Sequence, residues 1–379
     1  VVTAAIQSSS ATTVMVVGFV NSGIMKLSQA ITIIMGANIG TTMTSWILSL
    51  SGIEGGNIFL KFLKPTSFSP VLALVGIVFI MFSKKEKKKN IGTILIGFAI
   101  LMFGMETMSN AVSGLGNVPE FTNILTMFTN PILGVVVGAL LTAIIQSSSA
   151  SVGILQALCV TGVLKYSMVF PIILGQNVGT CVTAMISSIG ASRNAKRTAL
   201  VHLYFNIIGV AVFMIGFYSL NAIFDFDFLD NVAGSSGIAA IHSIFNVGAT
   251  IILLPFAKGL EKLAILTIRD TASDEKSKNV DKDFMTLDAR FLDQPSYAIA
   301  QARKVTINMA HHSMECLFKA MSLFEKFDEE IEKDVLTIED RVDRYEDNIG
   351  TYLVKLSSKN LSEKDSKILT ELLHCIGAF

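Results

Sequence analysis

Residues 3–13 read TAAIQSSSATT, and residues 142–152 repeat this segment as TAIIQSSSASV. An offset of 139 residues, which carries Gln7 onto Gln146, continues without a gap for forty-two positions, and eighteen of these positions are identical. The later part of each copy reads MGANIGTTMT at residues 35–44 and LGQNVGTCVT at residues 174–183. A self-match of this length indicates a duplicated structural unit.

Three serines follow each glutamine inside an otherwise apolar segment. Successive residues of an α-helix turn by about 100°, so three adjacent serines cannot share one face of a regular helix. The run predicts a helix break or a helix start that lines a cavity, because irregular backbone survives at membrane depth only beside protein or water. A helix start there offers free N–H groups to an anion. The predicted anion ligands are Gln7, Ser8, Ser9, Ser10, Gln146, Ser147, Ser148 and Ser149.

A second polar cluster follows in both copies, at Gly36–Thr42 and Gly175–Cys181. Its glycines permit close backbone approach, and its amide and hydroxyl oxygens suit a sodium ion. Small polar residues also serve as packing residues wherever membrane helices touch, and for one copy this alternative is as good as a binding site. Because both copies keep an amide and hydroxyls at matching positions, we favour a site. The predicted sodium ligands are Thr12, Asn38, Thr41, Thr42, Ser151, Asn177 and Thr180.

The charged residues gather in the last third of the chain. The protein has 379 residues, of which 51% are hydrophobic and 16% charged, whereas soluble domains carry about 25% charged residues. Apolar stretches long enough to cross about 30 Å of hydrocarbon recur up to Pro255. We predict membrane spans near residues 71–82, 91–112, 198–220 and 237–255, and two apolar regions interrupted by polar clusters, 1–50 and 131–189.

The basic loops predict how the two copies are oriented. The densest basic loop holds Lys84, Lys85, Lys87, Lys88 and Lys89, and the next holds Arg193, Lys196 and Arg197. Positive loops face the cytoplasm, which places equivalent points of the two copies on opposite sides of the membrane. The predicted fold is an all-α membrane protein with two inverted repeats built on broken or re-entrant helices, followed by a cytoplasmic helical domain. Its predicted parts are a transmembrane transport domain at 1–257 (repeat one 1–83, repeat two 91–257), a linker at 258–283 and a soluble helical region at 284–379.

At the duplicated motif the sequence resembles the sodium/phosphate cotransporter family, which includes the animal type II carriers and bacterial relatives. The signature of that family is the paired QSSS motif, present here at Gln7–Ser10 and Gln146–Ser149. The accompanying GANIGT pattern is found at Gly36–Thr41, and its second copy departs from it as GQNVGT at Gly175–Thr180. The resemblance covers about residues 1–255. It implies sodium-coupled movement of phosphate, with the two QSSS segments meeting at the substrate.

From about residue 284 the chain is expected to form soluble helices. Ile331, Val335, Ile338 and Val342 recur at three- and four-residue steps, which is typical of one helix face. This region resembles the PhoU family of helical bundles, the regulators of phosphate uptake that are often fused to such carriers.

An HxxFN pattern occurs twice, at His202–Asn206 and His242–Asn246. One interpretation is proton handling or a polar wall of the pathway. The other, which we favour, is a hydrogen-bonded pair that locks the two helices together.

The predicted function is sodium-coupled transport of inorganic phosphate across the cell membrane by alternating access. The alternatives are a phosphate exporter, a carrier of another oxyanion, or a membrane sensor that signals through the helical tail. An enzyme is not expected, because the apolar part lacks paired carboxylates or a nucleophile with its base.

The expected partners are phosphate, sodium as the coupling ion, and the lipid bilayer. No cofactor, no metal site and no nucleic acid are expected, and the sequence leaves open a homo-oligomer or a cytoplasmic regulatory partner of the tail. The protein is expected in the cell membrane with its C-terminal region in the cytoplasm. Because an apolar segment precedes the motif in repeat two, symmetry predicts about fifty further residues before Val1.

Overall fold

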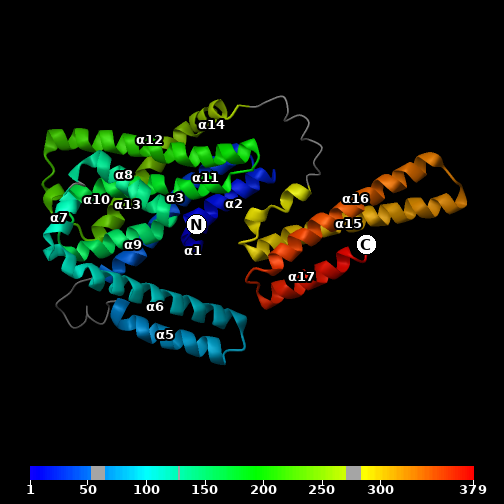
Figure 1. Cartoon of the computed structure of the whole chain (residues 1–379), viewed down its shortest axis with the longest axis horizontal. Coiled ribbons are helices and arrows are strands. Elements are labelled where there is room, and N and C mark those ends of the chain that lie inside the picture. The colour runs from blue at the N-terminus through cyan, green and yellow to red at the C-terminus, as the bar shows by residue number, and fades with distance from the viewer. Residues whose placement is uncertain (53–64, 127–128, 270–282) are drawn as a thin grey trace. The chain divides into compact units, whose positions relative to one another are not determined.

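The computed structural model describes residues 1–52, 65–126, 129–269 and 283–379 of the chain (Figure 1). Within these ranges the chain is helical, with turns and one isolated bridge between Lys165 and Val232. The predicted all-α class is therefore confirmed for the described residues.

The chain forms two compact units. The unit that we call the membrane unit comprises Val1–Thr13, Ile31–Ile186 and Ala199–Ala264. The unit that we call the tail unit comprises Val14–Ala30, Ser187–Thr198 and Ile265–Phe379. The tail unit thus contains two short stretches from the duplicated part of the chain as well as the C-terminal region.

Five helical segments of the described chain are long and apolar enough to cross a membrane. They are Leu27–Gly52, Glu86–Asn117, Tyr166–Ser187, Arg193–Phe224 and Ser235–Thr267. Three predicted spans, 91–112, 198–220 and 237–255, fall inside these segments. The fourth, 71–82, lies in α5 (Pro65–Phe82), whose apolar part is shorter. These lengths agree with a multi-pass membrane protein.

The helices of these segments follow the chain in order. They are α3 (Leu27–Ser49), α6 (Glu86–Ser113), α10 (Tyr166–Gly179), α11 (Cys181–Ser187), α12 (Arg193–Phe224), α13 (Ser235–Leu253) and α14 (Ala257–Thr267). A short helix, α7 (Pro119–Thr126), follows α6. The segment predicted as a linker, 258–283, therefore contains most of α14, and residues 270–282 of it lie outside the described chain.

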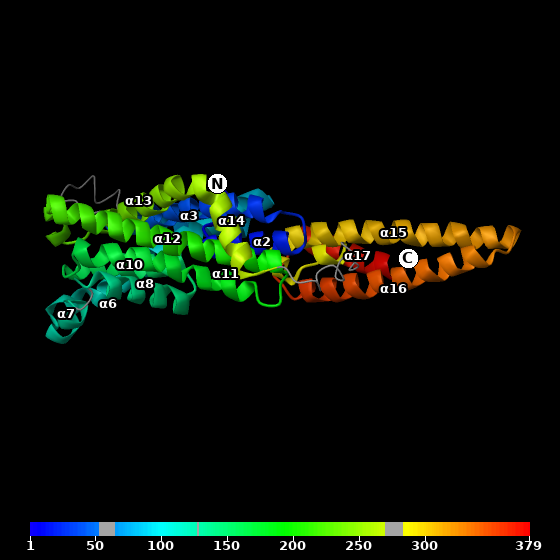
Figure 2. The same ribbon diagram turned by 90° about the horizontal axis from the view of Figure 1, so that it is seen from above.

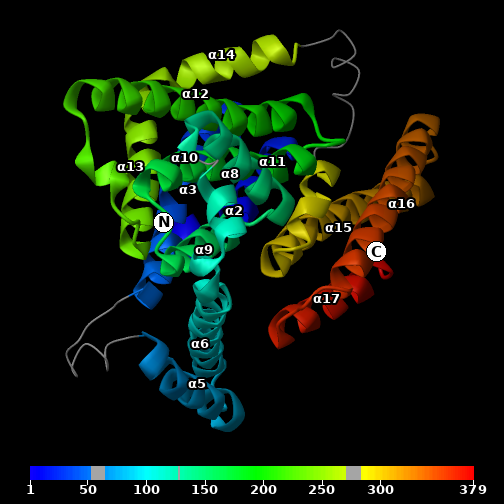
Figure 3. The same cartoon turned by 60° about the vertical axis from the view of Figure 1, so that its left-hand side comes forward.

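Glycines let neighbouring helices of the membrane unit approach closely. A Cβ atom on Gly138 of α8 (Pro131–Ile145) would lie 2.1 Å from the carbonyl oxygen of Ile172, and one on Gly175 would lie 2.0 Å from that of Val135. No side chain fits there, so α8 and α10 pack backbone against backbone, as small residues allow in membrane helices. α5 and α6 also lie side by side, as a hairpin (Figure 3).

The tail unit is built on three helices, α15 (Pro295–Glu325), α16 (Glu329–Ser357) and α17 (Glu363–Ile376). Figure 2 shows α15 and α16 running side by side. The predicted apolar face of α16 is confirmed as helical, but its residues are only half-buried. The fully buried core lies further along the same helix, at Tyr345, Ile349, Tyr352, Leu353 and Leu356.

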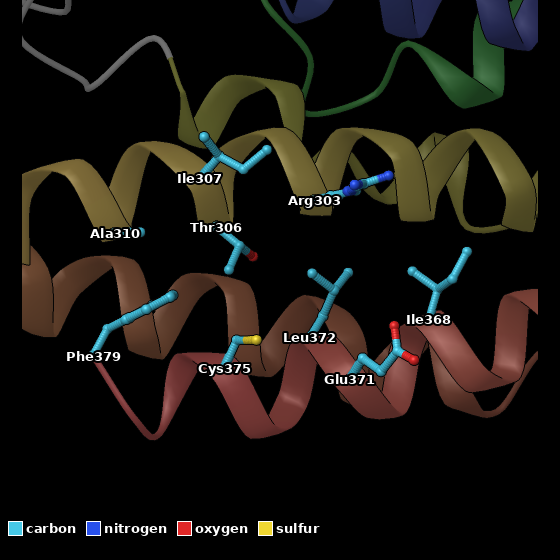
Figure 4. A pocket seen from close by; sticks show the side chains of 9 residues that line it. All are labelled: Arg303, Thr306, Ile307, Ala310, Ile368, Glu371, Leu372, Cys375 and Phe379. Carbon is cyan, nitrogen blue, oxygen red and sulfur yellow. The ribbon is translucent and has the colours of Figure 1, made fainter.

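A cavity of about 330 Å³ lies between α15 and α17 (Figure 4). Its lining is mostly apolar, with Ile307 on one helix and Leu372 on the other, and includes the charged residues Arg303 and Glu371. None of the residues predicted to bind phosphate or sodium lines this cavity.

A buried polar cluster, which we call the hook, holds three chain segments of the tail unit together. Asp288 Oδ2 accepts hydrogen bonds from Asn21 Nδ2 and from Arg290 Nη1, both at 2.6 Å. Asn21 Oδ1 in turn accepts from the N–H of Ser192 at 2.7 Å, and Arg290 Nε donates to the carbonyl oxygen of Ser187 at 2.8 Å. The end of α2 and the connection between α11 and α12 are therefore tied to the same C-terminal segment.

Aromatic packing surrounds the hook. The rings of Phe19 and Phe291 lie 5.3 Å apart, and the Phe291 side chain is fully buried. A Cβ atom on Gly18 would come within 2.8 Å of the Phe291 ring, so this position needs a glycine. The Tyr352 hydroxyl donates to the carbonyl oxygen of Asp288 at 3.2 Å, and burial, with a smaller contribution from Asp288, raises the pKa of Tyr352.

Asp288→Ala is expected to destabilise the tail unit. The Asp288 side chain is 4% exposed, and removing one partner of a buried ion pair leaves the other charge uncompensated, a loss on the order of 3 kcal/mol. The measurement is thermal unfolding of the purified protein in detergent. Lys359→Ala is the matched control, because Lys359 pairs with Asp293 at the surface and such pairs contribute about 0–1 kcal/mol. Equal unfolding temperatures for the two variants would contradict the role given to the hook.

Candidate functional site

Both copies of the repeat break a helix at the glutamine of the motif. α1 (Val2–Ile6) ends before Gln7, and α2 (Ser9–Asn21) begins after Ser8. α8 ends before Gln146, and α9 (Ser148–Leu158) begins shortly after it. The helix break predicted from the serine run is therefore confirmed in both copies.

The two glutamines share an unusual backbone conformation. The φ angle is 58° at Gln7 and 57° at Gln146, in the left-handed region that residues with a side chain rarely adopt. The N–H of each donates to the carbonyl oxygen four residues earlier, at 2.8 Å to Thr3 and 2.7 Å to Thr142. This conformation costs roughly 1–2 kcal/mol per residue. Its occurrence at matching positions points to a functional site.

The first serine of each motif caps the helix that follows. Ser8 Oγ accepts from the N–H of Ala11 at 3.1 Å, and Ser147 Oγ accepts from the N–H of Ala150 at 3.2 Å. Such a cap satisfies one of the four free N–H groups of a helix start and leaves others for a ligand. Of the other serines in the first turn, Ser9 and Ser148 are buried, whereas Ser10 and Ser149 are half-buried.

A hydroxyl pair links the two helices across each break. Thr3 Oγ1 donates to Thr12 Oγ1 at 3.2 Å in repeat one, and Thr142 Oγ1 donates to Ser151 Oγ at 2.8 Å in repeat two. Thr12 and Ser151 are predicted sodium ligands, and both are buried. The structure thus places a matching pair of hydroxyl oxygens at each break.

The second polar cluster lies in buried helices. α3 runs unbroken past Thr41, whereas the equivalent part of repeat two is interrupted at Thr180, between α10 and α11. The hydroxyls of Thr41 and Thr180 donate back to carbonyl oxygens of their own repeat, at 3.1 Å and 2.6 Å, so their oxygens keep lone pairs that could accept a cation. All predicted sodium ligands of this cluster are buried, namely Asn38, Thr41, Thr42, Asn177 and Thr180.

The HxxFN histidine of α12 contacts this cluster. His202 Nε2 lies 3.4 Å from Asn38 Oδ1, which links α12 to α3. Asn206 Nδ2 donates to the carbonyl oxygen of His202 in its own helix and to Cys181 Sγ of α11, and Asn246 Nδ2 donates to the carbonyl oxygen of His242 in its own helix. None of these hydrogen bonds joins α12 to α13. They therefore do not support the favoured interpretation, in which a hydrogen-bonded pair locks the two HxxFN helices together.

Gln156 joins the two repeats and was not among the residues predicted from the sequence. Its Nε2 atom donates to the carbonyl oxygens of Ser45 and Ser235, both at 3.1 Å, and its side chain is 1% exposed. Helix α9 of repeat two is thereby tied to α3 of repeat one and to α13. The only sequence feature that could have indicated this role is that Gln156 is the one amide within the apolar run SVGILQAL at residues 151–158.

Several buried polar atoms of the membrane unit lack a hydrogen-bond partner among the described residues. They are Asn38 Nδ2, Ser45 Oγ, Gln156 Oε1, Gln176 Oε1, Thr183 Oγ1, His202 Nδ1, Asn206 Oδ1, His242 Nδ1 and Asn246 Oδ1. An unsatisfied buried polar group costs about 1–3 kcal/mol, so native proteins keep few of them. A set this large among apolar helices favours an interior that holds water or polar ligands.

The two QSSS segments are each well defined, but their meeting at one site stays a prediction. Among the described residues, the side-chain hydrogen bonds of each segment remain within its own repeat. The contacts between the repeats come from other residues, such as Gln156 with Ser45 and His202 with Asn38.

Two family models match the chain. The model described as Na+/Pi-cotransporter matches residues 1–110 and 113–227, and the model of the PhoU domain matches residues 306–379. These ranges agree with the two resemblances found at the sequence motifs.

The curated relatives include bacterial and animal proteins. The "Putative inorganic phosphate export protein YjbB" of Escherichia coli is 25% identical over 98% of the chain, and the protein of that name in Salmonella typhimurium is 26% identical over 98%. The chain covers 65% of the length of each of these relatives. The human sodium-dependent phosphate transport protein 2B is 30% identical over 33% of the chain and 20% of its own length. No solved structure matches the chain.

Proposed function

Because the chain belongs to the Na+/Pi-cotransporter family, we propose that it carries inorganic phosphate across the cell membrane. The observation that supports this most is the matching pair of helix breaks at Gln7 and Gln146, each with a capped helix start beside it. Phosphate needs hydrogen-bond donors from several directions, and two helix starts that approach it from opposite sides can supply them. An enzyme is not supported, because the family is one of transporters.

The direction that we propose is export. The function predicted from the sequence is sodium-coupled transport, with a phosphate exporter among the alternatives. The relatives that match 98% of the chain bear the name of a phosphate export protein, whereas the sodium-dependent human carrier matches 33% of it. The names of these relatives favour the exporter.

Sodium that moves together with phosphate remains part of the proposal, and net export then requires the outward phosphate gradient to outweigh the inward sodium gradient. A role for sodium is supported by the buried hydroxyl pairs, Thr3 with Thr12 and Thr142 with Ser151, and by the amide of Asn38. Sodium ions beside phosphate would offset its charge, which explains how an anion could be held without an arginine. The predicted sodium and phosphate ligands are carried into this proposal unchanged.

The test of phosphate transport is exchange of radiolabelled phosphate in proteoliposomes that contain the whole chain. Vesicles loaded with unlabelled phosphate and sodium should accumulate labelled phosphate from outside, because exchange proceeds in either orientation of the protein. Protein-free vesicles set the background. Exchange at the background rate would refute the proposed function.

The inverted arrangement of the repeats predicts labelling from opposite sides of the membrane. In a chain without its own four cysteines, single cysteines at Gly56 and Asn194 should react with a membrane-impermeant thiol reagent from different faces. Asn194 is exposed, and Gly56 lies outside the described residues. The measurement is labelling of intact vesicles and of opened vesicles. Reaction of both cysteines from the same side would contradict the inverted repeats and the cytoplasmic placement of the basic loops.

A further inference from the structure

The side chains of the two motif glutamines differ in their hydrogen bonds. In repeat one, Thr44 Oγ1 donates to Gln7 Oε1 at 2.8 Å, and Gln7 Nε2 donates to the carbonyl oxygen of Ala4. In repeat two, Gln146 is exposed and makes no side-chain hydrogen bond to a described residue. The repeat offset places Thr183 where repeat one has Thr44, and Thr183 Oγ1 is buried without a partner among the described residues.

The backbone around the glutamine is similar in the two repeats. The φ angles of the two glutamines agree within one degree, at 58° and 57°. A Cβ atom on Gly40 would lie 2.6 Å from Thr3 Cβ, and one on the equivalent Gly179 would lie 2.7 Å from Thr142 Cβ. α3, which carries Gly40, therefore approaches α1 as closely as α10, which carries Gly179, approaches α8. Thr44 lies on α3 itself, whereas Thr183 lies on the short helix α11 that follows the interruption at Thr180.

The usual behaviour of a helical threonine does not explain these two residues. A threonine inside a helix commonly donates its hydroxyl to a carbonyl oxygen of the preceding turn. Thr41 and Thr42 do this in α3, at 3.1 Å and 2.8 Å. Thr44, on the same helix, instead reaches across to Gln7, and Thr183 does neither.

We propose that Thr44 and Thr183 are positioning residues that orient the motif glutamine of their own repeat, and that Gln146 docks onto Thr183 when repeat two engages phosphate. In the docked form the glutamine oxygen is held by the threonine. The amide orientation is thereby fixed, and the glutamine is ordered at the helix break. The structure then shows repeat one docked and repeat two undocked. This inference rests on the proposed function.

The test compares Thr183→Val with Thr183→Ser in the phosphate exchange assay. Valine keeps the shape of threonine without the hydroxyl, whereas serine keeps the hydroxyl. Thr183→Val should lower the exchange rate about tenfold, the effect of one lost hydrogen bond, and should raise the KM for phosphate. Its unfolding temperature in detergent should not fall, because the hydroxyl has no partner to lose. Thr183→Ser should retain most of the wild-type rate.

Thr107→Val is the matched control, because the hydroxyl of Thr107 bonds within α6 at an exposed position. It should leave the exchange rate unchanged. A wild-type rate and KM for Thr183→Val would overturn the positioning role while the proposed function stands. A loss of rate accompanied by a lower unfolding temperature, or a failure of serine to restore the rate, would also overturn it. Background exchange by the wild-type chain would instead refute the proposed function itself.

Discussion

Replacing Gln146 with alanine is expected to lower phosphate exchange about 100-fold while the chain stays folded. The side chain lies at the helix break of repeat two and is exposed, so its loss removes little packing. A hydrogen bond to a charged group contributes about 1.5–3 kcal/mol, and the lost amide would leave the phosphate with one donor fewer. Gln7→Ala should have an effect of the same size, because each repeat supplies one glutamine to the same ligand.

The measurement is the initial rate of exchange in proteoliposomes at equal protein content. Gln29→Ala is the matched control, because it removes the same amide from an exposed position at the start of α3. Unfolding temperatures of the three variants establish that they are folded. If either motif variant exchanged phosphate at the wild-type rate, the assignment of the glutamines to the phosphate site would be wrong.

Replacing sodium with choline on both sides of the membrane is expected to reduce exchange at least about tenfold, within the range of ordinary coupling energies. Proton-coupled carriers keep an ionisable group in the pathway, and residues 1–50 and 142–189 contain no Asp, Glu or His. A proton gradient should not restore the rate in choline.

The structure adds one residue that makes this test sharper. His202 contacts Asn38 at 3.4 Å and is an ionisable group that could carry a proton beside a predicted sodium ligand. His202→Gln in sodium should therefore retain exchange, whereas a proton-coupled carrier that uses this histidine would lose it. Full exchange driven by protons in sodium-free buffer would refute sodium coupling.

The helix breaks could be predicted because they follow from local chemistry. Three adjacent serines in an apolar segment cannot be accommodated on one helix face. Because the run recurs at Ser147–Ser149, it is not a chance cluster of serines. The left-handed backbone of the glutamines could not be predicted in the same way. Glycine and asparagine favour that region, and nothing in the letters QSSS indicates that Gln7 and Gln146 adopt it.

Contacts between residues far apart in the chain could not be predicted from the sequence. Asn21 and Asp288 are 267 residues apart, and the composition of the charged region does not indicate which carboxylate is buried. Gln156 is a single amide in an apolar run, which is equally compatible with a packing residue.

The sequence also did not indicate where the second helix of each repeat is interrupted. Thr41 and Thr180 are identical residues at equivalent positions, yet α3 continues past Thr41 whereas the helix of repeat two is interrupted at Thr180. Nothing in the structure explains this difference.

The periodicity of the C-terminal region predicted a helix but not its core. Ile331 and Val335 mark the apolar face of α16 correctly, yet they are half-buried. Tyr345 and Leu353 form the buried part because α17 packs on that end of the helix pair. Burial depends on which helices meet, and a pattern within one helix carries no such information.

The claim that the two repeats build one phosphate site is tested most directly by equilibrium binding of radiolabelled phosphate to the purified protein in sodium. The variants to compare with the wild-type chain are Gln7→Ala and Gln146→Ala. If the site is shared, either substitution should remove nearly all of the bound phosphate at a concentration that saturates the wild-type chain. If each variant instead keeps about half of the wild-type capacity with unchanged affinity, the repeats hold separate sites and the account is wrong.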